Sequence, residues 1–305
     1  MIVEIEDLVK HYGDIKAVDG ISFQVEEGEI FGMLGPNGAG KTTTVEIIEG
    51  LRVADSGRIR MMGEDAQKSR DNLKQKIGIQ LQAPSLLPLL NVEEMLDTFA
   101  GFYKHHLTVD EMLELLVLED SRKVVVKNLS GGQQQRLSVA MALINDPDIA
   151  FFDEPTTGLD PAARRGLWSV IEGMKAKGKT VFLTTHFMEE AERLCDRLAI
   201  MDHGKIIAMG SPADLIKEHF QEKAIEFEAE QPPPEDMLKG LPGATSVDID
   251  AEEVILHSED IAATMSGLLK YAENGDSSVQ IKDLRVREAS LEDVFLKLTG
   301  RKIRD

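Results

Sequence analysis

The fold of this chain is decided by residues 35–42, Gly35-Pro36-Asn37-Gly38-Ala39-Gly40-Lys41-Thr42. The apolar run EIFGMLG leads into this stretch, and the helically periodic run TTTVEIIEGL follows it. Glycines let the backbone curl so that its N–H groups surround a phosphate, and the start of the following helix faces the same anion. Lys41 can reach the β- and γ-phosphates, and the Thr42 hydroxyl can ligate Mg²⁺. We therefore predict a P-loop nucleotide site.

A pair of carboxylates supplies what a P-loop still lacks. Asp153 and Glu154 follow the apolar run Ile149–Phe152, which reads as a buried strand. At the end of such a strand Asp153 can hold Mg²⁺, and Glu154 is the natural general base for the attacking water. The alternative, an acidic pair that only ends a strand, would be favoured if this segment stood alone.

Strands alternate with helices over most of the chain, which predicts a parallel sheet in an α/β core. A mostly helical region interrupts this pattern at about residues 85–145. Within it, Leu129-Ser130-Gly131-Gly132-Gln133 opens a helix. A serine, two glycines and a helix N-terminus form a second anion site.

The order GPNGAGKT, LSGGQ, FFDEP resembles the ABC ATPases over residues 1–220. The resemblance implies an ABC cassette with a parallel-sheet core, an antiparallel β-subdomain and a helical subdomain. It also implies a homodimer whose copies pack head to tail, so that the LSGGQ signature of one chain caps the γ-phosphate held by the other. The cofactors would be ATP and Mg²⁺. The residues expected to act in trans are Ser130, Gly131, Gly132 and Gln133.

The resemblance assigns roles to four further positions. Tyr12 stands where an aromatic ring stacks on adenine, although a surface tyrosine is the usual alternative. Gln82 matches the glutamine that senses the metal and the attacking water and faces the membrane partner; Gln80 has the same chemistry, and we favour Gln82 because it follows the strand. Asp160 matches a dimer-interface loop. His186 matches a histidine that contacts the γ-phosphate, with a structural histidine as the alternative.

The expected site combines catalytic, metal-binding and ATP-binding residues. The expected catalytic residues are Lys41, Gln82, Glu154 and His186, and the expected metal ligands are Thr42, Gln82 and Asp153. The expected ATP-binding residues are Tyr12, Gly35, Pro36, Asn37, Gly38, Ala39, Gly40, Lys41, Thr42 and Thr43.

Residues 221–305 change in character and are predicted to form a small accessory α+β domain. QPPPED reads as a proline-rich turn, and Ser290 is a plausible cap for the helix SLEDVFLKLTG, with Asp293 as its capping acid. Residues 289–300 resemble the ending of drug-resistance and antibiotic-export ABC subunits. That branch implies an exporter with a separately encoded, polytopic permease. The helix has an apolar face, which could instead pack only on its own domain.

Composition limits the alternatives. The 305 residues carry a formal net charge of −20, which argues against nucleic-acid binding because phosphate backbones need a basic surface. The single cysteine, Cys195, forms no internal disulfide, and the acidic start lacks a signal-peptide pattern. No run reaches 18 apolar residues. We expect a cytoplasmic ATPase, peripheral at the inner face of the cell membrane, that powers export of drugs, lipids or other small molecules. The alternative is a non-transport ABC protein for iron–sulfur assembly or translation; the transported substrate stays open.

Overall fold

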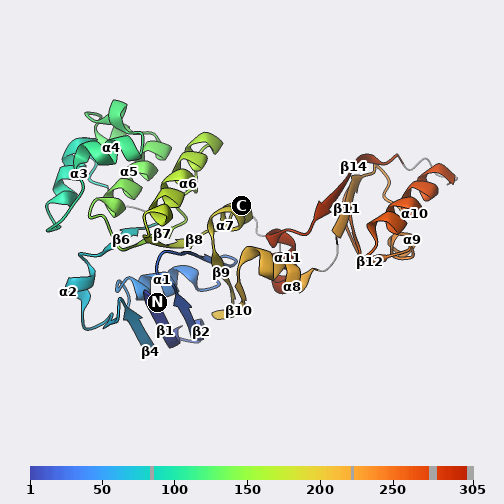
Figure 1. The fold of residues 1–305 in the computed structure, drawn as a ribbon, viewed down its shortest axis with the longest axis horizontal. Helices are drawn as coiled ribbons and strands as arrows, with labels where there is room; N and C mark the ends of the chain where they lie inside the picture. The colour runs from blue at the N-terminus through green and yellow to red at the C-terminus, as the bar shows by residue number, and fades with distance from the viewer. Residues whose placement is uncertain (83–85, 221–222, 275–279, 301–305) are drawn as a thin grey trace. The chain divides into compact units, whose positions relative to one another are not determined.

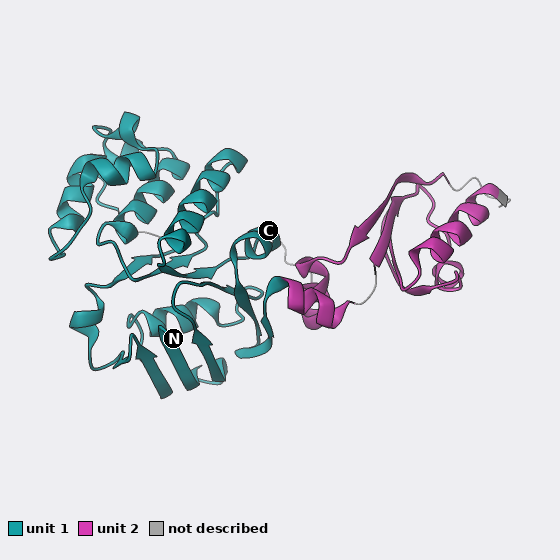
Figure 2. Ribbon diagram, viewed as in Figure 1, with its two compact units in different colours: residues 1–212, 303–305 teal, residues 213–302 magenta. Residues whose placement is uncertain are grey.

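The computed structural model describes residues 1–82, 86–220, 223–274 and 280–300. The chain forms two compact units that divide between Pro212 and Ala213 (Figure 2). The boundaries predicted at residues 85, 221 and 305 lie outside the described residues.

The first unit is built on a six-stranded sheet with the order β10-β9-β3-β8-β7-β6. Its strands from β6 to β9 and β3 run parallel, and β10 pairs antiparallel with β9. β3, β7 and β8 are buried at every position, as expected of parallel strands covered on both faces. The bounds are β3 Ile30–Leu34, β6 Ile77–Gln80, β7 Ile149–Asp153, β8 Thr180–Thr184, β9 Arg197–Asp202 and β10 Lys205–Gly210.

A second, antiparallel sheet has the order β2-β1-β4-β5 and packs with helix α1, Lys41–Ile48. Its inward apolar side chains share one core with Phe31, Phe151 and Phe182 of the parallel sheet. Figure 1 shows α1 on one side of the parallel sheet and α5 and α6 on the other. The strands are β1 Val3–Tyr12, β2 Ile15–Val25, β4 Ser56–Met61 and β5 Glu64–Asp65.

The helical region agrees with its sequence signals because each main helix carries its own cap. Capping boxes start α3 at Asn91, α4 at Thr108 and α5 at Ser130. A short helix, α2, was not expected from the sequence. The helices of the first unit are α2 Arg70–Leu73, α3 Val92–Ala100, α4 Val109–Leu115, α5 Gly131–Leu143, α6 Pro161–Ala176 and α7 Met188–Leu194, with 3-10 turns at Glu119–Ser121 and Val126–Asn128.

The second unit is an antiparallel sheet, β12-β13-β11-β14, whose apolar face packs on α9 and α10. The proline-rich segment is only partly a turn, because Pro234 precedes a short helix that starts at Glu235. Ser290 caps α11 with Asp293, and Gly300 ends it in a left-handed conformation. The elements are α8 Pro212–His219, β11 Lys223–Glu228, α9 Glu235–Lys239, β12 Ala244–Asp250, β13 Glu253–Ser258, α10 Ile261–Asn274, β14 Lys282–Glu288 and α11 Leu291–Thr299.

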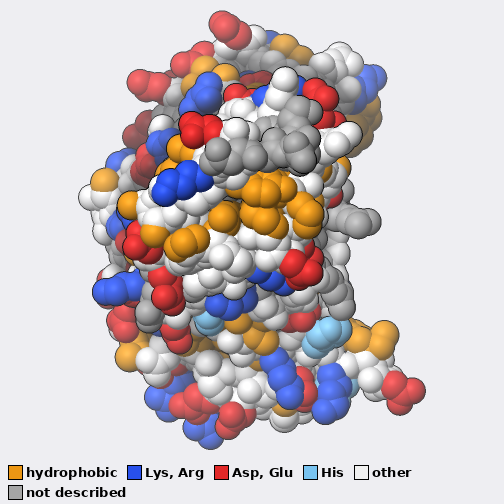
Figure 3. Space-filling view, turned by 90° about the vertical axis from the view of Figure 1, so that its right-hand side faces the viewer, with side chains coloured by type: hydrophobic (Ala, Val, Ile, Leu, Met, Phe, Trp, Pro, Cys, Tyr) orange, Lys and Arg blue, Asp and Glu red, His pale blue; other side chains and the backbone are white. Residues whose placement is uncertain are grey.

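The surface of the second unit carries exposed apolar side chains. Leu269 of α10 is 43% exposed and Val286 of β14 is 47% exposed, and both line one shallow depression. Figure 3 shows an apolar patch among charged side chains of both signs.

Among the described residues, no helix is both long enough and apolar enough to span a bilayer.

Candidate functional site

The loop between β3 and α1 needs glycine at two positions for steric reasons. A Cβ on Gly35 would lie 2.3 Å from the carbonyl oxygen of Met201. A Cβ on Gly40 would lie 2.0 Å from the carbonyl oxygen of Ala17, and Gly40 has a φ of 107°. Neither clash can be relieved by a rotamer change, because both neighbours are backbone. The close packing therefore fixes the loop whose N–H groups would face a phosphate.

Lys41 is buried at the first position of α1. Its Nζ donates to the carbonyl oxygens of Gly35, at 2.7 Å, and Pro36, at 3.3 Å. Burial lowers the pKa of Lys41, while the charges of Glu154 and Asp153 act to raise it. Backbone carbonyls thus hold a cation inside the loop, where an incoming phosphate can replace them as its partner.

Asp153 ends β7, beside the end of β8. The Thr184 hydroxyl donates to its Oδ1. Burial raises the pKa of Asp153, and Glu154 acts in the same direction against the Thr184 hydrogen bond. A buried carboxylate with a raised pKa gains free energy from a nearby cation, which suits a metal ligand.

Glu154 is the most constrained residue of the site. Its backbone is left-handed, with a φ of 49°, and its N–H donates to both the carbonyl oxygen and the hydroxyl of Thr184, each at 3.1 Å. Its Oε2 lies 3.3 Å from Nδ1 of His186 and 3.2 Å from Nε2 of Gln82. The hydrogen bond with His186 lowers the pKa of Glu154 against the effect of burial, helped by the charge of Lys41. Glu154 is therefore ionised near neutral pH and able to accept a proton.

The structure separates the two candidate glutamines. Gln80, the last residue of β6, is 1% exposed, and its Nε2 donates to the carbonyl oxygens of Leu81 and Asp153. Gln82 is exposed and contacts Glu154. Of the two, Gln82 is the one that the fold brings to the carboxylate.

Two other predicted positions have partners within this chain. The Tyr12 hydroxyl accepts from Arg52, whose guanidinium also lies 5.8 Å from the ring centroid. Asp160 caps α6 by accepting the N–H groups of Ala162 and Ala163, and these bonds lower its pKa.

The signature segment forms the start of α5. Ser130 accepts the N–H of Gln133, and the Gln133 amide donates to the Ser121 hydroxyl at 2.9 Å. Ser130 and Gly131 are exposed, so the N-terminus of this 13-residue helix is open to the surface. Further along α5, Gln135 donates to the carbonyl oxygen of Pro155 at 2.8 Å and so links the helix to the segment after Glu154.

Sequence reasoning missed the polar residues that support the site from behind. Thr156, Thr184, Thr185 and Glu190 are all buried, as is Glu49 at the end of α1. The only signal was the pair of threonines directly before His186. A buried glutamate in a helix that begins with several acidic residues is not distinguishable from its exposed neighbours by sequence alone.

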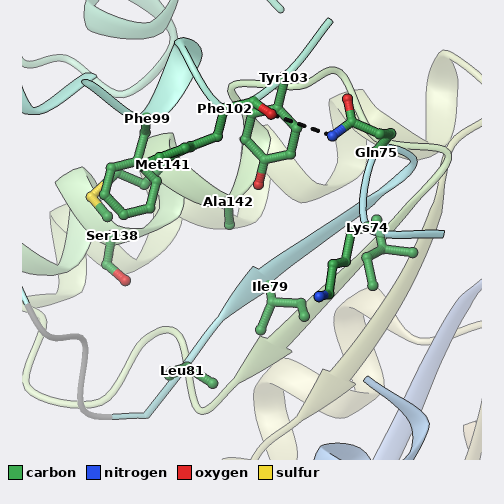
Figure 4. A pocket seen from close by; sticks show the side chains of 11 residues that line it. Lys74, Gln75, Ile79, Leu81, Phe99, Phe102, Tyr103, Ser138, Met141 and Ala142 are labelled. Carbon is green, nitrogen blue, oxygen red and sulfur yellow. Dashed lines mark hydrogen bonds between the residues drawn. The ribbon is translucent and has the colours of Figure 1, made fainter. Parts of the chain in front are cut away.

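An apolar pocket of about 470 Å³ lies between β6, α3 and α5 (Figure 4). Phe99 and Phe102 meet edge to face at 5.8 Å, and Phe102 is 67% exposed. Gln75 fixes one wall, because its Nε2 donates to the Phe102 carbonyl oxygen. Leu81, next to Gln82, lines the other end. The pocket thus extends to the residue beside the candidate site.

Comparison with known proteins gives two family matches and several relatives. The family described as ABC transporter matches residues 18–157, and the family described as ATP-binding protein DrrA1-3-like, C-terminal domain, matches residues 210–299. The Nod factor export ATP-binding protein I of Ralstonia nicotianae is 40% identical over 311 residues, covering 100% of this chain and 95% of the relative. The protein of the same name from Burkholderia lata is 39% identical and covers 99% of this chain and 98% of the relative.

Solved structures give the same picture. The ATP-binding subunit of an ABC transporter aligns with a TM-score of 0.66 at 29% identity, covering 72% of this chain and 93% of that chain. A dimeric post-hydrolysis state of an ATP-binding cassette bound to ADP and Pi aligns with a TM-score of 0.64 at 28% identity, covering 69% of this chain and 98% of that chain.

Proposed function

This chain belongs to the family of ABC transporter ATP-binding proteins, and from that premise we propose that it powers export through a separately encoded, polytopic membrane permease. As a member of that family, it is a transport-coupled ATPase that binds and hydrolyses ATP. One observation carries the catalytic part of the proposal: an ionised Glu154 held between His186 and Gln82 at the ends of the strands beside the P-loop. Likeness over the whole chain to export ATP-binding proteins supports the export part.

The proposed reaction assigns one task to each side chain. The N–H groups of residues 37–40 and the ammonium of Lys41 bind the phosphates. Glu154 takes a proton from water, whose oxygen attacks the γ-phosphorus; the bond to the β–γ bridging oxygen breaks, and its electron pair leaves with ADP. Gln82 and His186 orient that water and the γ-phosphate, because each contacts the Glu154 carboxylate.

Mg²⁺ fits the residues present. Thr42 offers a hydroxyl, Gln82 an amide oxygen and Asp153 a carboxylate, and Mg²⁺ prefers such oxygen ligands. The raised pKa of Asp153 indicates a carboxylate that a cation would stabilise. When bound, the ion would neutralise phosphate charge. We propose these three residues as its ligands.

We further propose a head-to-tail homodimer. The exposed N-terminus of α5, with Ser130, Gly131, Gly132 and Gln133, offers an anion site that the P-loop of the same chain does not use. In the proposed dimer this signature caps the nucleotide of the second copy. Asp160 and Tyr12 are proposed as a dimer-loop residue and an adenine contact.

The apolar pocket beside β6 is the proposed docking surface for the permease. An apolar helix of the permease would place aromatic and aliphatic side chains against Phe99, Phe102 and Leu81. Leu81 is bonded to Gln82, so movement of a docked segment would reach the residue that contacts Glu154. Such docking would hold the chain at the inner face of the cell membrane.

We assign residues 1–220 to the ATPase domain and 221–305 to an accessory domain.

A pull-down tests the partner. Tagged Glu154→Gln protein, which should hold MgATP without turning it over, is incubated with detergent-solubilised native membranes and analysed by mass spectrometry. We expect one polytopic membrane protein to co-purify, and less of it when Phe102→Asp is added. Val117→Asp is the matched control, because Val117 is 68% exposed and does not line the pocket. Recovery of only ribosomal or iron–sulfur assembly proteins would contradict the export proposal and leave the ATPase assignment intact.

A further inference from the structure

A fully buried carboxyl lies behind the candidate site. Glu190, on α7, is 0% exposed, and its Oε1 accepts the indole N–H of Trp168 on α6 at 2.7 Å. Burial raises the pKa of Glu190, while the hydroxyl of Thr185, the indole of Trp168 and the hydroxyl of Thr156 act to lower it. The carboxyl is therefore near three other segments of the chain, but among the described residues only Trp168 donates a hydrogen bond to it, since its Oε2 and the Thr156 hydroxyl have no hydrogen-bond partner.

Two of these segments carry reactive groups. Thr156 follows Glu154 by two residues in the segment after β7, and Thr185 directly precedes His186 after β8. Both threonines are buried, and the Thr185 hydroxyl also accepts the N–H of Phe187 at 3.0 Å. The Glu190 carboxyl is thus near the segment that follows Glu154 and the segment that precedes His186, and these two residues are themselves 3.3 Å apart.

The third segment extends this connection to the dimer loop proposed above. Trp168 belongs to α6, whose first turn is capped by Asp160. Arg164 of the same helix lies 4.2 Å from the ring of Phe187, next to His186. Helix α6 is therefore joined to the segment that follows His186 at two points. The contact of Trp168 with Glu190 of α7 is the buried one of the two.

We propose that Glu190 is a positioning residue for ATP hydrolysis, which through its hydrogen bond with Trp168 holds α6 and the helix that follows His186 in one arrangement. This rests on the proposed roles of Glu154 and His186. Without the carboxyl, α6 loses its buried hydrogen bond to α7, the helix that follows His186, and the position of His186 relative to Glu154 is less constrained. Nucleotide binding depends on the P-loop and Lys41, which Glu190 does not contact through any of the interactions described.

The test compares kcat and KM for ATP in the full chain. Glu190→Ala should lower kcat by about 10- to 100-fold and leave KM within about twofold, because a small misplacement of reacting groups costs rate rather than binding. Glu190→Gln keeps an oxygen that can accept from Trp168 and should recover most of the lost kcat. Glu189→Ala is the matched control, since it removes an exposed glutamate from the same turn of α7 and should leave kcat at the parental value.

The proposal is overturned if the kcat of Glu190→Ala stays within about twofold of the parent value. It is also overturned if the rate falls only in proportion to the fraction of protein that still binds ATP. If Glu190→Ala does not fold, Trp168→Phe decides: it keeps an aromatic ring and removes the N–H, and an unchanged kcat would refute the positioning role. Glu154→Gln in the same assay separates the two proposals. If Glu154→Gln hydrolyses ATP at the parental rate, Glu154 is not the base. If Glu154→Gln is slow and Glu190→Ala is fully active, only the inference on Glu190 is refuted.

Discussion

The candidate site of the first unit and the contact between β14 and α11 in the second unit bury charged groups in opposite ways. In the first unit, Lys41 is held by backbone carbonyls and Asp153 by a threonine hydroxyl, and burial shifts the pKa of each toward its neutral form. In the second unit, Arg287 makes two hydrogen bonds to Asp293 and lies 3.0 Å from Glu226.

The difference indicates which charges are paired within the protein and which are available to a ligand. Burial acts to raise the pKa of Asp293, but Arg287 together with the hydrogen bonds from Ser290 outweighs it, so the pKa of that carboxyl stays below its usual value. These charges of the second unit are satisfied within the unit and hold its sheet to α11. The charges of Lys41 and Asp153 in the candidate site have no such ion pair with the residues that the structure describes and are left for a ligand, as expected at a functional site. Three substitutions would sharpen or break this comparison.

The largest effect is expected at Glu154. Replacing it by glutamine removes the proton acceptor but keeps the size of the side chain, so kcat should fall by about 10²- to 10⁴-fold. ATP binding should persist, because the P-loop is unchanged. Single-turnover hydrolysis and equilibrium nucleotide binding measure the two quantities, and a kcat close to that of the parent would show that another group is the base.

A smaller effect is expected at Arg287 in the second unit. Arg287→Ala leaves the buried Glu226 and the half-buried Asp293 without this partner and should destabilise that unit by about 2–3 kcal/mol. Trp168, the single tryptophan, is buried in the first unit and reports on that unit alone. When the variant is unfolded in urea, far-UV circular dichroism should show an additional transition at a lower urea concentration. The Trp168 fluorescence transition and kcat should stay unchanged. An equal shift of both signals would mean that the two units unfold together.

The smallest effect is expected at Glu49, at the end of α1. Burial, together with the charges of Asp153 and Glu46, raises the pKa of Glu49 to about 9. The unfolded chain ionises this carboxyl near its ordinary pKa, so the folded state binds the extra proton and its stability falls as the pH rises from about 4.5 to 9. Glu49→Gln abolishes this dependence.

The gain in stability of Glu49→Gln over the parent should therefore grow with pH, by roughly 1–2 kcal/mol between about pH 6 and 7. Urea unfolding of both proteins at several pH values, followed by Trp168 fluorescence, measures that gain. A difference that does not vary with pH would show that Glu49 is ionised in the folded state.

Much of the fold could be predicted because its signals are local. The prediction of an ABC cassette with ATPase activity is confirmed by the family matches and the solved relatives. Glycine spacing specified the loop at residues 35–42, and capping residues marked the starts of α5 and α11. The roles assigned to individual site residues stay predictions.

Other features were not accessible to sequence patterns. Gln80 and Gln82 have the same chemistry, and although the sequence favoured Gln82 for its place after the strand, its contact with Glu154 is given only by the folded structure. The proline-rich segment was predicted as a turn, yet Pro234 precedes α9, because proline with acidic residues behind it is compatible with a helix start as well. Glu189 and Glu190 are identical in type and adjacent, yet one is exposed and the other fully buried.

The sequence by itself determined the chemistry of this protein: the phosphate-binding loop, the acidic pair at residues 153–154 and the signature at residues 129–133 are each contiguous and need only local backbone geometry. The tertiary structure alone decided which charges are compensated. Thr156, Thr185, Trp168 and Glu190 meet from four segments, and Arg287 reaches Glu226 across a strand pair. Burial and partnership depend on residues far apart in the chain, and those contacts exist only once the sheets and helices have packed.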